Sequence, residues 1–118
     1  MLAYIHERLV VGAAADGRHV ASDDLAGDFN SYVRTRGHQD WSQKTFLTRF
    51  ADHESVIGAG VRKARVRGED GLSRPGAGTA ASPFPTAAYA ALPTQYSAWI
   101  GVRFRGADED AHEGGSAA

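Results

Sequence analysis

Residues 20–66 read VASDDLAGDFNSYVRTRGHQDWSQKTFLTRFADHESVIGAGVRKARV, and this stretch decides the fold that the sequence predicts. Its first part favours an amphipathic helix over residues 22–36. Ser22 is the expected N-cap and Gly37 the expected C-terminal stop. The apolar side chains of this helix follow the helical period and predict one buried stripe. They are Leu25, Phe29, Tyr32 and Val33.

A second amphipathic helix is expected over residues 42–53, with Ser42 as its N-cap. Trp41 precedes the cap and should pack on Phe46, the arrangement known as a hydrophobic staple. Phe46, Leu47 and Phe50 form the expected core face. Two helices joined by about four residues are typical of a helix-turn-helix.

The flanking residues complete the predicted fold. A short helix is expected over residues 1–11 and a short strand over residues 18–21. Residues 55–67 are rich in β-branched residues and glycine and predict a longer strand. Residues 96–105 alternate apolar and polar side chains with a period of two, which predicts a half-buried strand. This order is that of a winged helix, an α+β fold with three helices, a small antiparallel β-hairpin and a wing loop.

One domain is expected over residues 1–105. Residues 68–95 contain all four prolines together with many Gly, Ala and Ser residues, which predicts a long flexible wing loop. Residues 106–118 are acidic and rich in Gly and Ala, which predicts a disordered tail.

The net charge of -1 is unevenly distributed along the chain. Residues 33–67 have a balance of +5, whereas residues 1–32 and 68–118 each have a balance of -3. A basic middle between acidic flanks favours a surface that binds a polyanion, and an ordinary solvated surface is the alternative. The chain has no cysteine and no apolar run near the roughly 20 residues that span a bilayer. We therefore expect a cytoplasmic protein with no membrane partner.

The sequence contains no recognisable motif for catalysis or cofactor binding. Residues 58–63, GAGVRK, lack the spacing of a phosphate-binding loop and precede no expected helix. The five histidines have no paired spacing that would suggest a zinc site. Asp23 and Asp24 are explained by the dipole at a helix N-terminus. The sequence thus predicts no enzyme activity, no cofactor and no metal.

Nine polar and basic residues are predicted to contact DNA. On the second helix, Lys44, Thr45 and Thr48 point away from the core stripe, with Arg49 on the flank and Gln43 at the first turn. These groups could enter a major groove, where Arg, Lys and Gln side chains have donors suited to base edges. Those on the strand after this helix should contact phosphates; they are Arg62, Lys63, Arg65 and Arg67. The alternatives are a solvated helix face and a charged strand edge that prevents pairing. Asp52 on the same helix face counts against phosphate contact.

The chain resembles the C-terminal domain of phage- and plasmid-encoded primase–helicases of the satellite-phage alpha-protein type. The matching residues are Val20, Asp24, Leu25, Phe29, Tyr32, Ser42, Phe46, Phe50, Trp99, Gly101, Val102 and Phe104. The resemblance covers most of residues 2–105 and implies a winged-helix module that binds duplex DNA at a replication origin. Two departures are the absence of the primase and helicase portions and the longer insertion at residues 68–95.

Three functions therefore remain open. The first is an origin-reading domain or remnant of a primase–helicase, and the second is a small transcriptional regulator on the same fold. The third is a protein-interaction winged helix that docks to a replication ATPase or to itself. Its expected docking surface would be the wing and the helix carrying Leu2, Ile5 and Leu9.

Overall fold

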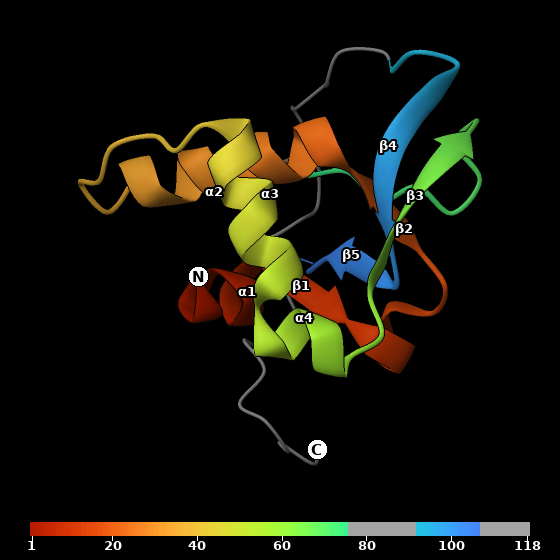
Figure 1. The fold of residues 1–118 in the computed structure, drawn as a ribbon, viewed down its shortest axis with the longest axis horizontal. Coiled ribbons are helices and arrows are strands. Elements are labelled where there is room, and N and C mark those ends of the chain that lie inside the picture. The colour runs from red at the N-terminus through yellow and green to blue at the C-terminus, as the bar shows by residue number, and fades with distance from the viewer. Residues whose placement is uncertain (76–91, 107–118) are drawn as a thin grey trace.

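The computed structural model describes residues 1–75 and 92–106. Residues 76–91 of the expected wing loop and residues 107–118 of the expected tail lie outside the described residues. The helices and strands, shown in Figure 1, are α1 Leu2–Arg8, β1 Leu9–Val11, the 3-10 turn η1 Gly12–Ala15, β2 His19–Ala21, α2 Ser22–Arg34, α3 Gln43–Asp52, α4 Glu54–Gly58, β3 Arg62–Arg67, β4 Gln95–Ile100 and β5 Val102–Phe104.

The strands form two small antiparallel sheets, and the consecutive strands β4 and β5 belong one to each sheet. In the larger sheet β4 lies between β2 and β3, and in the smaller sheet β5 pairs with β1. Gly101 joins β4 to β5 with a φ of 91°, a conformation that side-chain-bearing residues rarely adopt. Its N–H donates to the Arg18 carbonyl at 2.9 Å and its carbonyl accepts from Gly12 N–H at 2.8 Å. The chain therefore bends at Gly101 to serve both sheets.

The core lies between the helices and the larger sheet, and aromatic rings dominate it. Successive ring pairs join α1 to α2, α2 to α3, and α3 to β4, with centroids 4.4–5.3 Å apart. The rings are Tyr4, Phe29, Phe46, Phe50 and Trp99, each no more than 5% exposed. Burying a large apolar side chain fully contributes about 1.5–3 kcal/mol, so this row of rings fixes α3 on the sheet. The α+β prediction is confirmed at this level.

The two helix N-termini differ in how they are capped. Ser42 is the N-cap of α3, as predicted, because its Oγ accepts a hydrogen bond from Thr45 N–H at 3.1 Å. The prediction for Ser22 is wrong, since Ser22 is the first residue of α2 and makes no capping bond. Its Oγ instead accepts from Trp99 Nε1 at 3.1 Å and lies 2.9 Å from the Ser97 Oγ. This hydroxyl thus joins α2 to β4.

Trp41 is partly buried and packs against the core just before α3. Its ring lies 4.9 Å from that of Phe29 at an angle of 64°, while Phe46, its expected staple partner, stacks on Phe29 at 4.4 Å. Asn30 holds the Trp41 backbone through bonds to both its N–H and its carbonyl, each 2.9 Å long. The loop between α2 and α3 is therefore held at its C-terminal end, next to α3.

The strand predicted over residues 55–67 begins only at Arg62, and residues 54–58 form the additional short helix α4. The His53 Nδ1 accepts from Ser55 N–H at 3.1 Å and caps this turn, and Val56 is buried at 1% exposure. Gly60, with a φ of 77°, then redirects the chain into β3. The expected total of three helices is corrected to four α-helices within the described residues.

The structure also differs from two further predictions, one for residues 1–11 and one for residues 68–75. The helix expected over residues 1–11 ends at Arg8, because Leu9–Val11 pairs with β5 in the register Leu9↔Phe104. Residues 68–75, expected as part of the flexible loop, pack along β2. There the N–H of Ser73 donates to the His19 carbonyl at 2.8 Å, and Leu72 forms a parallel bridge with His19.

Candidate nucleic-acid interface

The five predicted residues of α3 are all exposed, as their position opposite the Phe46 and Phe50 stripe requires. Two of them also have bonds within the fold. Gln43 donates through Nε2 to the Asp23 carboxylate at 2.9 Å, and the Thr45 Oγ1 accepts from the Ser42 hydroxyl at 2.9 Å. Lys44, Thr48 and Arg49 extend from the helix into solvent.

The four predicted residues of β3 are exposed as well, although neighbouring side chains of a strand point to opposite faces. β3 is at the edge of the described sheet, and its exposed side chains include Arg62 on one face and Lys63, Arg65 and Arg67 on the other. Lys63, Arg65 and Arg67 lie opposite Trp99, Ser97 and Gln95 on β4.

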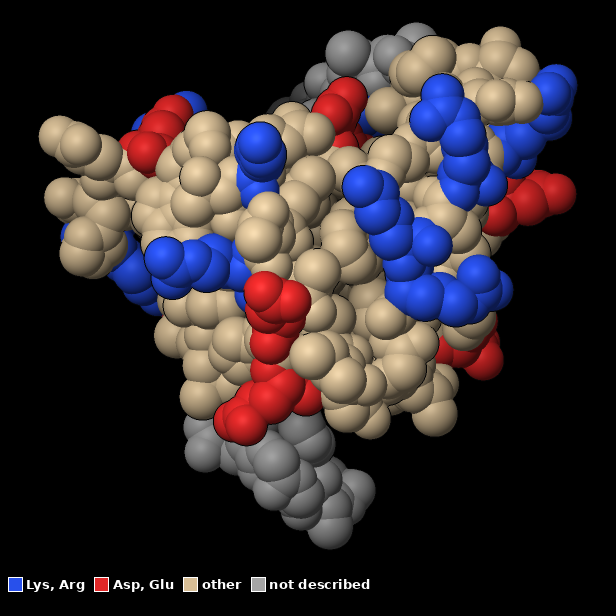
Figure 2. Space-filling model, viewed as in Figure 1, with Lys and Arg blue, Asp and Glu red and all other residues tan. Residues whose placement is uncertain are grey.

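Trp99 packs on Phe50 of α3, so the face of the sheet that carries Trp99 is the face that α3 covers. Lys63, Arg65 and Arg67 belong to this same face by register, and Arg62 belongs to the other. Figure 2 shows basic side chains gathered where β3 lies, with others over α3 and acidic ones toward α4. The sheet register therefore brings a basic row beside the exposed helix.

A hollow of ≈ 390 Å³, which we call the α3–β3 groove, separates α3 from β3. Its lining residues are Lys44, Leu47, Thr48, Ala51, Asp52, Lys63 and Trp99. Three predicted DNA-contacting residues, Lys44, Thr48 and Lys63, meet in this groove although they come from two separate segments. Lys63 also lines an adjoining hollow of ≈ 280 Å³ together with Gln43.

Not every predicted residue lines these hollows. Arg65 lies with Lys63 and Ser97 around a shallow depression farther along β3, while Arg49, Arg62 and Arg67 are exposed outside all three hollows. Sequence reasoning did not predict Ser97 at this surface. The alternation along residues 96–105 indicates which face of the strand carries Ser97, and its pairing with Arg65 places it beside the basic residues of β3.

The electrostatics of the groove are mixed. Asp52 lies in it together with the two lysines, and Asp23 lies in the adjoining hollow. Carboxylates repel phosphate, whereas ammonium groups attract it and release counterions on binding. The strongest attraction for a polyanion is thus expected from Lys63 outward along β3, where Arg65 and Arg67 are the next side chains on this face.

The buried polar groups outside the groove tie elements together. Asp28 accepts from the Tyr4 hydroxyl and from Arg8 Nη1, each at 2.8 Å, and joins α1 to α2. Burial raises the pKa of Asp28 even though Arg8 and Tyr4 oppose the shift. Among residues 1–75 and 92–106, no three His, Asp or Glu side chains come close enough to hold a metal ion. The Asp28 contacts therefore hold α1 against α2.

Comparisons with protein-family models, curated proteins and solved structures found no match for this chain. No helix in the described part of the chain has the length and apolar character needed to cross a membrane.

Proposed function

We propose that this chain is a winged-helix module that binds duplex DNA through the α3–β3 groove and the basic side chains of β3. The observation that carries the proposal is the position of Lys63, which lines the same groove as Lys44 and Thr48. A helix face and a basic strand side by side match a duplex, which offers base edges in its groove and phosphates at the groove's rim.

The strand order supports the winged-helix part of this proposal. In a winged helix the strand that precedes the helix pair joins the last strand, and the last strand also pairs with the strand between helix and wing. The order β2-β4-β3 has this form, and α2 and α3 come directly after β2. The additional α4 and the β1–β5 pair are compatible with it, because neither covers the exposed face of α3.

In this proposal α3 is the recognition helix and β3 supplies phosphate contacts. Lys44 and Thr48 would reach base edges, and Arg65 and Arg67 would contact the backbone. α2 is less suited to enter a groove, because Asp23 and Asp24 lie in its first turn. The resemblance to primase–helicase C-terminal domains supports a role at a phage or plasmid replication origin, with a helicase or primase module as a partner.

The protein-interaction alternative expected docking through the wing and through the apolar face of the first helix, and only the helix lies wholly within the described residues. Ile5 and Leu9 are each 1% exposed, so that face is packed in the core, and Leu2 alone of the three is exposed, at 49%. This burial favours DNA binding over docking through α1.

Fluorescence anisotropy with a labelled generic duplex over a range of salt concentrations tests the proposal. The affinity of the unmodified chain should fall steeply with salt, since each phosphate contact adds about 0.9 to the logarithmic slope. Arg65→Ala with Arg67→Ala should weaken binding on any sequence and flatten the slope by about one unit per lost contact. Arg34→Ala, which removes an exposed arginine of α2, is the matched control and should leave the slope unchanged. A chain that shows no salt-dependent binding would refute the proposal.

A further inference from the structure

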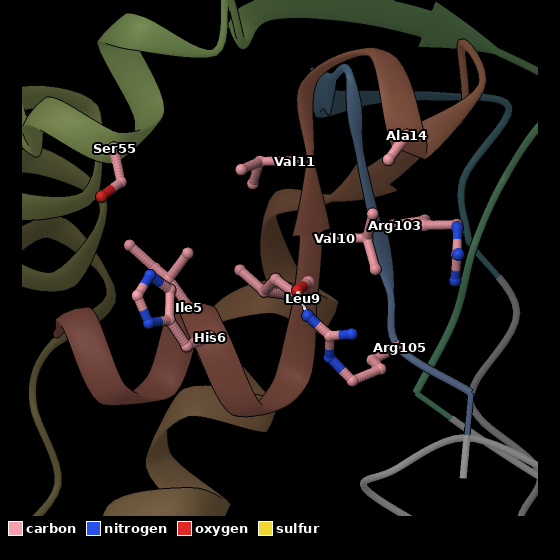
Figure 3. Close-up of a pocket in the computed structure, with 9 residues that line it drawn as sticks. All are labelled: Ile5, His6, Leu9, Val10, Val11, Ala14, Ser55, Arg103 and Arg105. Carbon is pink, nitrogen blue, oxygen red and sulfur yellow. Dashed lines mark hydrogen bonds between the residues drawn. The ribbon is translucent and has the colours of Figure 1, made fainter. Parts of the chain in front are cut away.

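A further hollow, of ≈ 330 Å³, lies among α1, β1, η1, α4 and β5 (Figure 3). Five of its nine lining residues are apolar, among them Ile5, Leu9 and Val11. Its volume is at the lower end of the range of small-molecule sites, about 300–1,000 Å³. It shares no lining residue with the α3–β3 groove, so the two hollows are separate sites.

The four polar lining residues are donors or cations, namely His6, Ser55, Arg103 and Arg105. Within the described ranges 1–75 and 92–106, no Asp or Glu lines the hollow. Figure 3 shows Ser55 across from Ile5 and His6, and Arg105 running back toward Leu9, while Arg103 extends to the opposite side. An apolar hollow whose charged groups are all of one sign favours an anionic ligand with an apolar body.

Arg105 is the most fixed of these cations. It is 6% exposed, its Nη2 donates to the Leu9 carbonyl at 3.0 Å, and its backbone N–H donates to the Arg8 carbonyl at 2.8 Å. A guanidinium held in place in this way loses little freedom when an anion is added to the contacts that it already makes. Its planar fork suits a carboxylate, with which arginine forms charge-assisted bonds.

We propose that this hollow binds a carboxylate attached to a short apolar chain. The carboxylate would lie near Arg105 and His6, and the apolar chain would lie against Ile5, Leu9 and Val11. The mainly apolar walls account for the apolar body, which a bare inorganic anion could not use.

A carboxylate could come from two sources, a free small acid or this chain itself. Residues 107–118 come soon after Arg105 in sequence and include Asp108, Glu109 and Asp110. The same carboxylate chemistry applies to both, so the experiment must separate them.

The test is an amide-resolved NMR titration of the full chain with sodium hexanoate, with hexanol as the neutral probe of equal length. Hexanoate should shift the amides of Val10, Val11 and Ala14 saturably, and hexanol should bind at least tenfold more weakly. Ala14→Phe should abolish the shifts by filling the hollow. The variant should still fold, because Ala14 is exposed on η1 and contributes little to the core. Equal binding of hexanol and hexanoate, or shifts confined to other residues, would overturn the proposal.

Two variants locate the anion and its source. Arg105→Lys keeps the charge but not the fork and should weaken hexanoate at least fivefold, whereas Arg18→Lys, an arginine outside the hollow, should not. If Arg105→Lys fails to fold, the difference in affinity between hexanoate and hexanol still tests the proposal. The full chain with Asp108→Asn, Glu109→Gln and Asp110→Asn separates the sources. Unchanged hexanoate affinity supports a free acid, and affinity raised fivefold, with the same amides shifted before any ligand is added, supports the chain's own carboxylates.

Discussion

The indole of Trp99 on β4 meets the ring of Phe50 on α3 at an angle of 86°, with ring centroids 5.3 Å apart. Aromatic pairs prefer such edge-to-face geometry and gain about 0.5–1.5 kcal/mol beyond the area they bury. Because Lys63 lies opposite Trp99 in the β3–β4 register, this ring pair also sets where Lys63 stands relative to α3. The α3–β3 groove is therefore positioned by the core directly beneath it.

Replacing Phe50 with Leu should lower the free energy of unfolding by about 1–2 kcal/mol, since the new side chain is smaller and loses the ring contacts with Trp99 and Phe46. Urea denaturation measures this as a lower midpoint at an unchanged slope. Ile57→Ala is the matched control, because Ile57 is 62% exposed and its loss should change stability by less than about 0.5 kcal/mol. Equal losses for the two variants would show that Phe50 does not hold α3.

Thr48 and Lys63 line the same groove, but replacing each of them should weaken DNA binding in a different way. Thr48→Ala is expected to cost on the order of 1–3 kcal/mol of binding on a cognate site and less on random duplex, as for a base contact. Lys63→Ala should weaken both duplexes alike and flatten the salt slope by about one unit, as for a phosphate contact. Paired titrations of a selected site and a random duplex measure the difference. Equal losses for Thr48→Ala on both duplexes would make α3 a phosphate-binding element instead.

The long periodic helices could be predicted from sequence because their signal is local. The stripe of Leu25, Phe29, Tyr32 and Val33 is buried in α2, and Ser42 caps α3 as expected. β1 could not be predicted, because three residues gain a strand conformation only by pairing with β5, more than 90 positions away. Ser22 fits the local rule for an N-cap, but its hydroxyl is used by Trp99, a contact that no local pattern reveals.

The candidate interface, like the fold, could be predicted from the sequence only in part. The exposure of Lys44 and Thr48 is a consequence of the helical period, and the exposure of Arg65 a consequence of its place in a charged edge strand. That Lys63 shares a groove with Lys44 and Thr48 depends on the register of β3 on β4, and residues 68–94 between these strands make that register impossible to read from the sequence.

Acidification should destabilise the protein through His19. Its Nε2 donates to the Tyr96 hydroxyl at 2.9 Å, since that hydroxyl donates in turn to the Gly68 carbonyl at 2.5 Å. Burial lowers the pKa of His19, and the nearby Arg18 lowers this pKa further. The unfolded chain then binds the proton more tightly than the folded one, so the contribution of His19 to stability is lost as the pH falls below about 6.5.

Melting temperatures measured between pH 8 and pH 5 check this prediction. His19→Gln retains an amide donor for Tyr96 but does not titrate, so its stability should fall less over this range than that of the unmodified chain. Parallel curves for the two proteins would show that other groups cause the acid sensitivity.

The ion pair of Asp24 and Arg74 should stabilise the protein more than its exposed counterpart does. Arg74 donates to both Asp24 oxygens, at 2.8 and 3.0 Å, and the two side chains are 7% and 23% exposed. Arg34 and Asp40 form a similar two-bond pair at 2.6 Å with side chains that are 63% and 46% exposed. Solvent and salt screen the second pair much more strongly than the first.

A double-mutant cycle on each pair, read by urea denaturation, measures the coupling free energy directly. For Asp24→Asn and Arg74→Ala we expect about 1–3 kcal/mol, because Arg74→Ala alone leaves the Asp24 carboxylate buried and deprived of two bonds. For Asp40→Asn and Arg34→Ala the coupling should be smaller and should shrink further in high salt. A coupling for Asp24 and Arg74 no larger than that of the exposed pair would mean that residues 68–75 are held in place by the backbone bond from Ser73 to His19 on β2 rather than by charge.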